Sequence, residues 1–174
     1  MMNSDPGQLA ERGKQAFAAK DFDGAASLFT EAASVYEALE EALNAAEMKN
    51  NLSVALLQAG KAQAAHDAAA GTDEIFAQAG DLKRQAMAFG NQAAALEALK
   101  KPDQALEAYE RSAALFAEAG DSEMRSIVLQ SIAAIKLKRG NMMDSALSMI
   151  GSVEATKKPN LLQRFLRFLL RIRP

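Results

Sequence analysis

The feature of this sequence that most constrains its fold is an internal repeat with a period of 40 residues. A shift of the chain by this period aligns a row of small residues and, four positions later, a row of mostly larger ones. The small row is Ala25, Ala65, Ala105 and Ser145, and the second row is Phe29, Ala69, Tyr109 and Met149. A single unit of this size cannot bury its apolar side chains, so neighbouring units must stack into one continuous core. The repeat therefore predicts a solenoid.

Turn-forming residues divide each unit into two helices. Breaks within the units are expected at Lys20-Asp21, Gly60-Lys61, Lys101-Pro102 and Gly140-Asn141. Between units, a glycine stop is followed by an aspartate N-cap at Gly80-Asp81 and Gly120-Asp121. No Gly or Pro marks the remaining boundary, near Glu40-Glu41. We expect four units that contain eight helices, at about 5–40, 41–80, 81–120 and 121–156.

Composition favours an all-α fold for these units. Hydrophobic residues make up 49% of the chain but aromatic residues only 6%, so alanine supplies much of the apolar content, which suits closely packed helices better than strands. The chain has no Cys, which excludes disulfides and thiolate metal sites. The N-terminal stretch MMNSDPGQLAERG lacks the basic and apolar regions of a signal peptide, so we expect a cytoplasmic protein.

The stretch GKQAFAAKDFDGAASLFTEA resembles a tetratricopeptide repeat, with small residues at Gly13 and Ala25 and an aromatic residue at Phe29. The likeness extends over about residues 7–156. Repeats of this family usually span about 34 residues, so the longer period predicts longer helices. The resemblance implies a right-handed superhelical solenoid of four helix-turn-helix repeats, with a concave face that binds a peptide of another protein.

No constellation of residues in the sequence points to catalysis. His66 is the only histidine, and without Cys the chain cannot assemble a transition-metal cluster of the usual ligand spacing. The carboxylates are spread along helices rather than paired beside a base, and no serine lies in a G-x-S-x-G motif. We therefore expect no metal, no cofactor and no enzymatic activity.

In the architecture that the resemblance implies, the first helix of each unit lines the concave groove. Spacings of three and four residues along these helices place a set of candidate contact residues on one face. The set is Lys14, Asn44, Glu47, Asn51, Arg84, Met87, Asn91, Ile127 and Ser131. Its mixed character suits a short apolar peptide or helix better than a phosphate-rich polymer.

Asn51 and Asn91 are the main candidates within this set. An amide both donates and accepts hydrogen bonds, so it can pair with the backbone of an extended peptide. The resemblance adds that family members often hold peptides with asparagines at this place. The alternative is that both asparagines bond locally or only face solvent. Of the clamp residues in relatives that bind a chaperone's C-terminal carboxylate, only Asn51 has a counterpart here, so a chaperone-tail receptor is disfavoured.

The C-terminal segment, residues 157–174, differs from the rest of the chain in charge. It carries six basic residues and no acidic one, whereas residues 1–156 carry 14 basic and 22 acidic residues, a net charge of −8. Pro159-Asn160 predicts the start of an amphipathic helix over 161–173, about 20 Å long and too short for a bilayer core of about 30 Å. Its expected contact face is Leu162, Phe165, Leu166, Phe168, Leu169 and Ile172.

Three roles are open for this helix. It could cap the last unit, lie on a membrane surface with its arginines among anionic headgroups, or pair with another chain in a homo-oligomer. Binding to nucleic acid is not expected, because bulky aliphatic residues separate the arginines and the rest of the chain is acidic. Two functional hypotheses follow. The chain is an adaptor that binds a peptide segment of an unidentified protein in its groove, or it is an assembly component that docks through residues 160–174.

Overall fold

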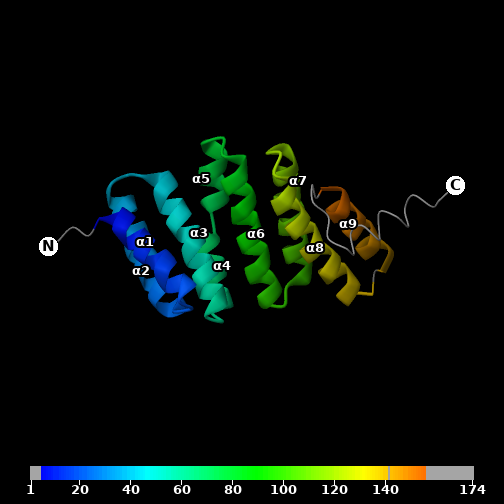
Figure 1. Ribbon diagram of the computed structural model, residues 1–174, viewed down its shortest axis with the longest axis horizontal. Coiled ribbons are helices and arrows are strands. Elements are labelled where there is room, and N and C mark those ends of the chain that lie inside the picture. The colour runs from blue at the N-terminus through cyan, green and yellow to red at the C-terminus, as the bar shows by residue number, and fades with distance from the viewer. Residues whose placement is uncertain (1–4, 141, 156–174) are drawn as a thin grey trace.

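The computed structural model describes residues 5–140 and 142–155, and this part of the chain forms nine helices and no strand. The helices stand side by side in chain order, from α1 at one end of the molecule to α9 at the other (Figure 1). Their bounds are α1 Pro6–Ala18, α2 Phe22–Ala38, α3 Ala42–Gln58, α4 Ala62–Ala69, α5 Thr72–Gln78, α6 Leu82–Ala98, α7 Pro102–Glu118, α8 Ser122–Lys138 and α9 Met142–Ala155. The predicted all-α solenoid is confirmed.

The solenoid is a stack of helical hairpins. In each hairpin a first helix (α1, α3, α6 or α8) is followed after a short turn by a second element (α2, α4 with α5, α7 or α9). Each of the inner first helices packs both against the second element that precedes it and against the one that follows it. This alternation joins the hairpins into one continuous array.

A single residue in the left-handed region ends most of the helices. Gly80 and Gly120 both have a φ of 70°, and Glu40 adopts a φ of 60° although it is not a glycine. The Glu41 N–H then donates to the Tyr36 carbonyl at 2.9 Å, which closes the end of α2. The boundary without a sequence marker therefore uses the same turn as the others, at a cost of about 1 kcal/mol.

The rows of small and large residues form the core. Ala25, Ala65 and Ala105 are fully buried, and Phe29 is almost so. Gly13 lies on α1 against the Phe29 ring, and a Cβ on Gly13 would lie 2.7 Å from Phe29 Cε1. The glycine is therefore required by close packing of α1 on α2.

The expectation of eight helices is wrong at the second element of the second hairpin. This element is interrupted between α4 and α5, where Ala70 is extended and Gly71 takes a left-handed φ of 75°. The Thr72 hydroxyl donates to the Ala69 carbonyl at 2.8 Å, which satisfies one acceptor that the break leaves without a helical partner. The sequence contained a signal for this break, because Gly71 followed by Thr72 has the same form as the glycine-and-cap pairs between units.

None of the described helices is both long and apolar enough to span a bilayer. The helix predicted over 161–173, with its apolar contact face, lies outside the described residues, so its three proposed roles stay predictions.

Candidate functional site

The residues predicted to contact a ligand lie on the four first helices, and their surroundings divide them into three groups. The first group lines a pocket and consists of Lys14 and Asn51. The second group makes bonds within the protein and consists of Asn44, Glu47, Arg84, Asn91 and Ser131. The third group exposes apolar side chains and consists of Met87 and Ile127, called the apolar pair below.

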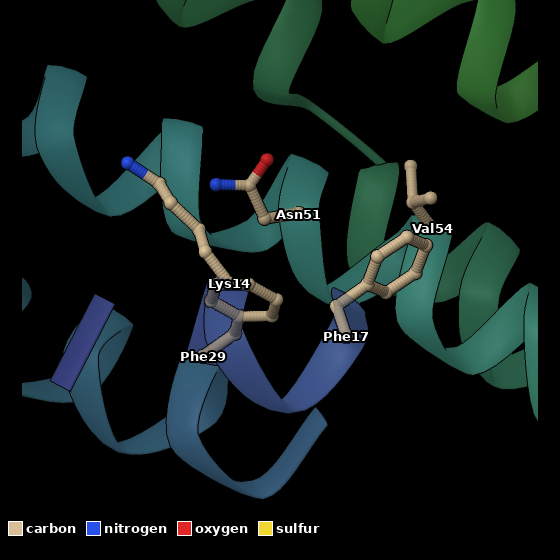
Figure 2. Close-up of a pocket in the computed structure, with 5 residues that line it drawn as sticks. All are labelled: Lys14, Phe17, Phe29, Asn51 and Val54. Carbon is tan, nitrogen blue, oxygen red and sulfur yellow. The ribbon is translucent and has the colours of Figure 1, made fainter. Parts of the chain in front are cut away.

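The pocket is formed where α1, α2 and α3 meet, and its volume is about 170 Å³. Its lining residues are Lys14, Phe17, Phe29, Asn51 and Val54. Figure 2 shows the Lys14 and Asn51 side chains on one side of the pocket and Phe17 and Val54 on the other. The arrangement therefore combines an apolar cavity with an ammonium group and an amide at one edge.

Helical spacing explains how the chain builds this pocket. Lys14 and Phe17 are three residues apart on α1, and Asn51 and Val54 are three apart on α3, so each pair shares a face. The Phe17 ring meets the Phe22 ring edge-on at 5.3 Å between centroids, which fixes its position. Phe17 and Phe29 were not among the predicted contact residues. The repeat pattern marks Phe29 as core, and only the arrangement of three helices reveals its second role.

The polar groups at the edge of the pocket are free to bind a ligand. Within the part of the chain that the structure describes, the Asn51 side chain makes no hydrogen bond, so its amide keeps both donor and acceptor capacity. Lys14 Nζ has only a 4.0 Å contact with Glu11 Oε2, and both side chains are more than half exposed. An ion pair of this kind contributes little and is easily replaced.

The second asparagine has different surroundings. Asn91 Nδ2 donates to the Asn50 carbonyl at 3.5 Å, so this amide is engaged within the protein. Asn44 likewise donates to the Glu41 carboxylate, and Ser131 is hydrogen-bonded to Tyr109. The two asparagines that the sequence placed in one row are therefore not equivalent: among the described residues the Asn51 amide makes no hydrogen bond, whereas one N–H of Asn91 makes a long one.

Arg84 is held by two carboxylates on the same face. Its Nε lies 2.6 Å from Asp81 Oδ2, and its Nη1 lies 3.1 Å from Glu47 Oε2 on α3. Asp81 also caps α6 by accepting the Arg84 backbone N–H at 2.9 Å. This backbone hydrogen bond, together with the Arg84 guanidinium, lowers the pKa of Asp81, and the hydrogen bond with Asp81 raises the pKa of Arg84. Arg84 is thus committed to its neighbours.

The Asp81 cap gives the protein a pH-dependent stability. Because the native pKa of Asp81 is lowered, its contribution is present above the unfolded pKa of about 4 and is lost as pH falls through the native pKa. We expect Asp81→Ala to lower the free energy of unfolding by about 1–2 kcal/mol at pH 7 and by clearly less at pH 3. Urea unfolding at both pH values measures this difference. Asp81→Asn keeps a capping oxygen and should recover part of the loss, whereas equal losses at both pH values would contradict the assignment.

The apolar pair lies on the other half of the row. The Met87 side chain on α6 is 44% exposed and Ile127 on α8 is 52% exposed, although both are large and apolar. The predicted contact residues therefore include two apolar regions, the pocket and the apolar pair. The ion pairs of Arg84 separate these two regions.

A second pocket, which the sequence did not indicate, lies among α7, α8 and α9. It measures about 270 Å³, and its lining includes Arg125, Lys136 and Glu110. Lys136 pairs with Glu110 at 3.3 Å, and within residues 5–140 and 142–155 the buried Nε of Arg125 has no hydrogen-bond partner. The described residues contain no group of three His, Cys, Asp or Glu side chains that could hold a metal ion.

Comparison with known proteins places this geometry in context. A family model described as "Soluble NSF attachment protein, SNAP" matches residues 11–165. The crystal structure of BtubC (BKLC) from P. vanneervenii has a TM-score of 0.74 to this structure at 16% sequence identity, covering 100% of this chain and 69% of BtubC. At this identity the likeness concerns the fold. A search of curated proteins found no match. Both matches support a helical-repeat protein, but neither specifically supports the tetratricopeptide family.

Proposed function

The chain belongs to the soluble NSF attachment protein family, and from this membership and the groove geometry we propose that it is a non-enzymatic adaptor. Its ligand is a peptide segment of a partner protein, bound along the first helices. The observation that carries this proposal is the apolar pocket, which has at its edge the exposed Lys14 ammonium and the Asn51 amide, unpaired among the described residues. The family description names an attachment protein for NSF, which favours a protein as the partner.

The chemistry of the pocket fits one aliphatic side chain of an extended peptide. Phe17, Phe29 and Val54 provide an apolar lining, and burial of one Leu or Ile side chain is worth about 1.5–3 kcal/mol. The Asn51 amide can donate to and accept from the peptide backbone beside that residue, which adds about 0.5–1.5 kcal/mol for each hydrogen bond. The resemblance to tetratricopeptide proteins, which hold peptides on the same helices, supports this use of the groove.

The proposal predicts that the two asparagines differ in their contribution to binding. Peptides would be selected from a random library on the immobilised protein, and their affinity measured by fluorescence polarisation. We expect Asn51→Ala to weaken binding by a few-fold to about tenfold, because one or more hydrogen bonds are lost. Asn91→Ala is the matched control and should leave affinity nearly unchanged, because Asn91 is bonded to Asn50. Failure to select any peptide, or equal losses for both variants, would refute the groove proposal.

The alternative function, docking through residues 160–174 on a membrane surface or on a second copy, concerns residues that the structure does not describe. It rests on the basic, amphipathic sequence of that segment, part of which falls within the family match. We retain it as a second hypothesis, together with a cytoplasmic or membrane-peripheral location.

A further inference from the structure

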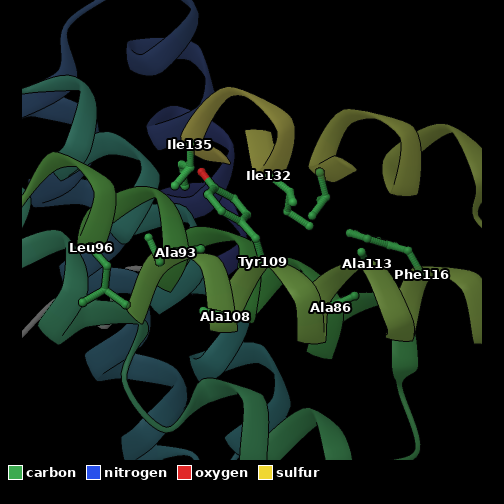
Figure 3. Packing of buried hydrophobic residues seen from close by; sticks show 11 residues of the cluster. Ala86, Ala93, Leu96, Ala108, Tyr109, Ala113, Phe116, Ile132 and Ile135 are labelled. Carbon is green, nitrogen blue, oxygen red and sulfur yellow. The ribbon is translucent and has the colours of Figure 1, made fainter. Parts of the chain in front are cut away.

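The hydrophobic core of the solenoid is divided into two large clusters. One cluster joins α1, α2 and α3 and includes Leu9, Phe29 and Met48. The other joins α6, α7 and α8, and Figure 3 shows its packing around Tyr109 and Phe116. Between them lies only a small cluster that consists of Ala46, Phe76 and Ala88, with Ile75 against it. Fewer large apolar side chains are therefore buried at the centre of the array than on either side.

Polar side chains replace apolar ones at this central junction. Gln92 on α6 donates to the Ala69 carbonyl at 3.2 Å and to Asp73 Oδ1 at 2.8 Å. One period earlier and one period later, the same repeat position holds Leu52 and Ile132, and each of these packs into one of the large clusters. The junction is thus held by directional hydrogen bonds where the neighbouring hairpins use apolar contact.

The helix break lies at the same junction. Both α4 and α5 contact α3 and α6, but α4 packs more on α3 and α5 packs more on α6. Between them, Ala70 and Gly71 are outside any helix, and a Cβ built on Gly71 would meet nothing within 4 Å. The second element therefore shifts its main contact from α3 to α6 at a non-helical link, whereas the corresponding α2 and α7 are unbroken.

On the groove side, the long hydrogen bond from Asn91 to the Asn50 carbonyl and the ion pair of Arg84 with Glu47 cross the junction. The Arg84 and Glu47 side chains are 33% and 41% exposed, so solvent can replace this ion pair at low cost. Regions with few buried apolar contacts open and bend more readily than a continuous core.

We propose that the described part of the solenoid consists of two stiff bodies, α1–α4 and α5–α9, joined by a hinge at Ala70 and Gly71. The pocket belongs to the first body and the apolar pair of Met87 and Ile127 to the second. A ligand that contacts both therefore fixes the angle between the bodies. The hinge does not depend on the proposed adaptor function. Only the coupling between ligand binding and the angle of the two bodies rests on that function.

The chain offers a matched test, because it contains no Cys and its repeat supplies equivalent label positions. Ser27, Asp67, Glu107 and Leu147 are exposed and stand one period apart on α2, α4, α7 and α9. Spin labels on pairs of Cys substitutions give three distance distributions by electron-electron resonance. The pair 67/107 crosses the hinge, whereas 27/67 and 107/147 lie within single bodies. We expect the 67/107 distribution to be at least twice as broad as the other two, and equal widths would overturn the hinge.

Addition of a peptide selected on the protein tests the second step. We expect the 67/107 distribution to narrow and the other two to stay unchanged. A peptide that binds without changing 67/107 would overturn the coupling while leaving the adaptor function intact. If no peptide is selected, the adaptor function and the coupling both fail, and the three widths in the free protein still decide the hinge.

Hydrogen exchange on the unlabelled chain provides a measurement that does not depend on labelling. We expect amide protons of α5 to exchange at least tenfold faster than those in the second half of α7, which has the equivalent position in an unbroken helix. Equal protection would count against a hinge.

Discussion

Phe76→Ala should lower the free energy of unfolding by about 3–5 kcal/mol and divide the unfolding transition into two. Phe76 is completely buried, and it is the only large side chain of the small central cluster within the described residues. The Arg84 guanidinium also lies over its ring at 5.2 Å from the centroid. In a linear array, stability is the sum of unit and interface terms, so loss of the central interface leaves each half to unfold by itself.

The two tyrosines of the chain allow each half to be followed separately. Tyr36 packs against the cluster of α1–α3 and Tyr109 belongs to the cluster of α6–α8, and the sequence has no Trp. Tyr36→Phe leaves Tyr109 as the fluorescent reporter, and Tyr109→Phe leaves Tyr36. Introduced into the parent, the two substitutions should give urea unfolding transitions with the same midpoint. Introduced into Phe76→Ala, they should give transitions with different midpoints. Phe76→Leu is the matched control, because it keeps most of the apolar volume and should cost less than about 1.5 kcal/mol without separation. Coincident midpoints in Phe76→Ala would show that the two halves remain one cooperative unit.

The fold could be predicted from the sequence because the residues that determine it act locally and recur at a fixed period. The small residues at Ala25, Ala65 and Ala105 and the glycine stops repeat at one spacing, and each acts on its own hairpin. The boundary at Glu40 was placed by the period alone, since its turn contains no glycine. The break at Gly71 was not predicted, because the repeat period favours a continuous helix there and only a single Gly-Thr pair indicates otherwise.

The candidate site could be predicted only in part from the sequence, for a different physical reason. Helical spacing predicted one shared face for Lys14 and Asn51, and both side chains line the pocket between α1, α2 and α3. Whether an amide on that face is free depends on the distance between neighbouring helices, which the spacing does not contain. The Asn91 amide reaches the Asn50 carbonyl on α3, whereas Asn51 meets no such acceptor among the described residues. Sequence patterns therefore placed these residues on one face, and packing between helices determines which of their polar groups are already hydrogen-bonded within the protein.

Gly13→Ala should weaken binding of a selected peptide by about ten- to a hundredfold without removing any polar group from the groove. The added Cβ would lie 2.7 Å from Phe29 Cε1 and 2.9 Å from its Cδ1. Because Phe29 is only 3% exposed and is packed by the core on its other sides, the space open to its ring is the adjacent pocket. A ring displaced into about 170 Å³ leaves no room for an aliphatic anchor, whose burial is worth about 1.5–3 kcal/mol.

The free energy of unfolding of this variant should fall by only about 0–2 kcal/mol. Overpacking costs about 1–3 kcal/mol, and replacement of a helical glycine by alanine returns about 1 kcal/mol. Gly90→Ala is the matched control in α6, because its Cβ would lie 3.4 Å from Ser112 Oγ and needs little adjustment. That control should be as stable as the parent or up to about 1 kcal/mol more stable, with unchanged affinity. If Gly13→Ala binds the peptide as tightly as Gly90→Ala does, the ligand is not anchored between α1 and α3, and the apolar pair on α6 and α8 becomes the contact to test next by Met87→Ser and Ile127→Ser.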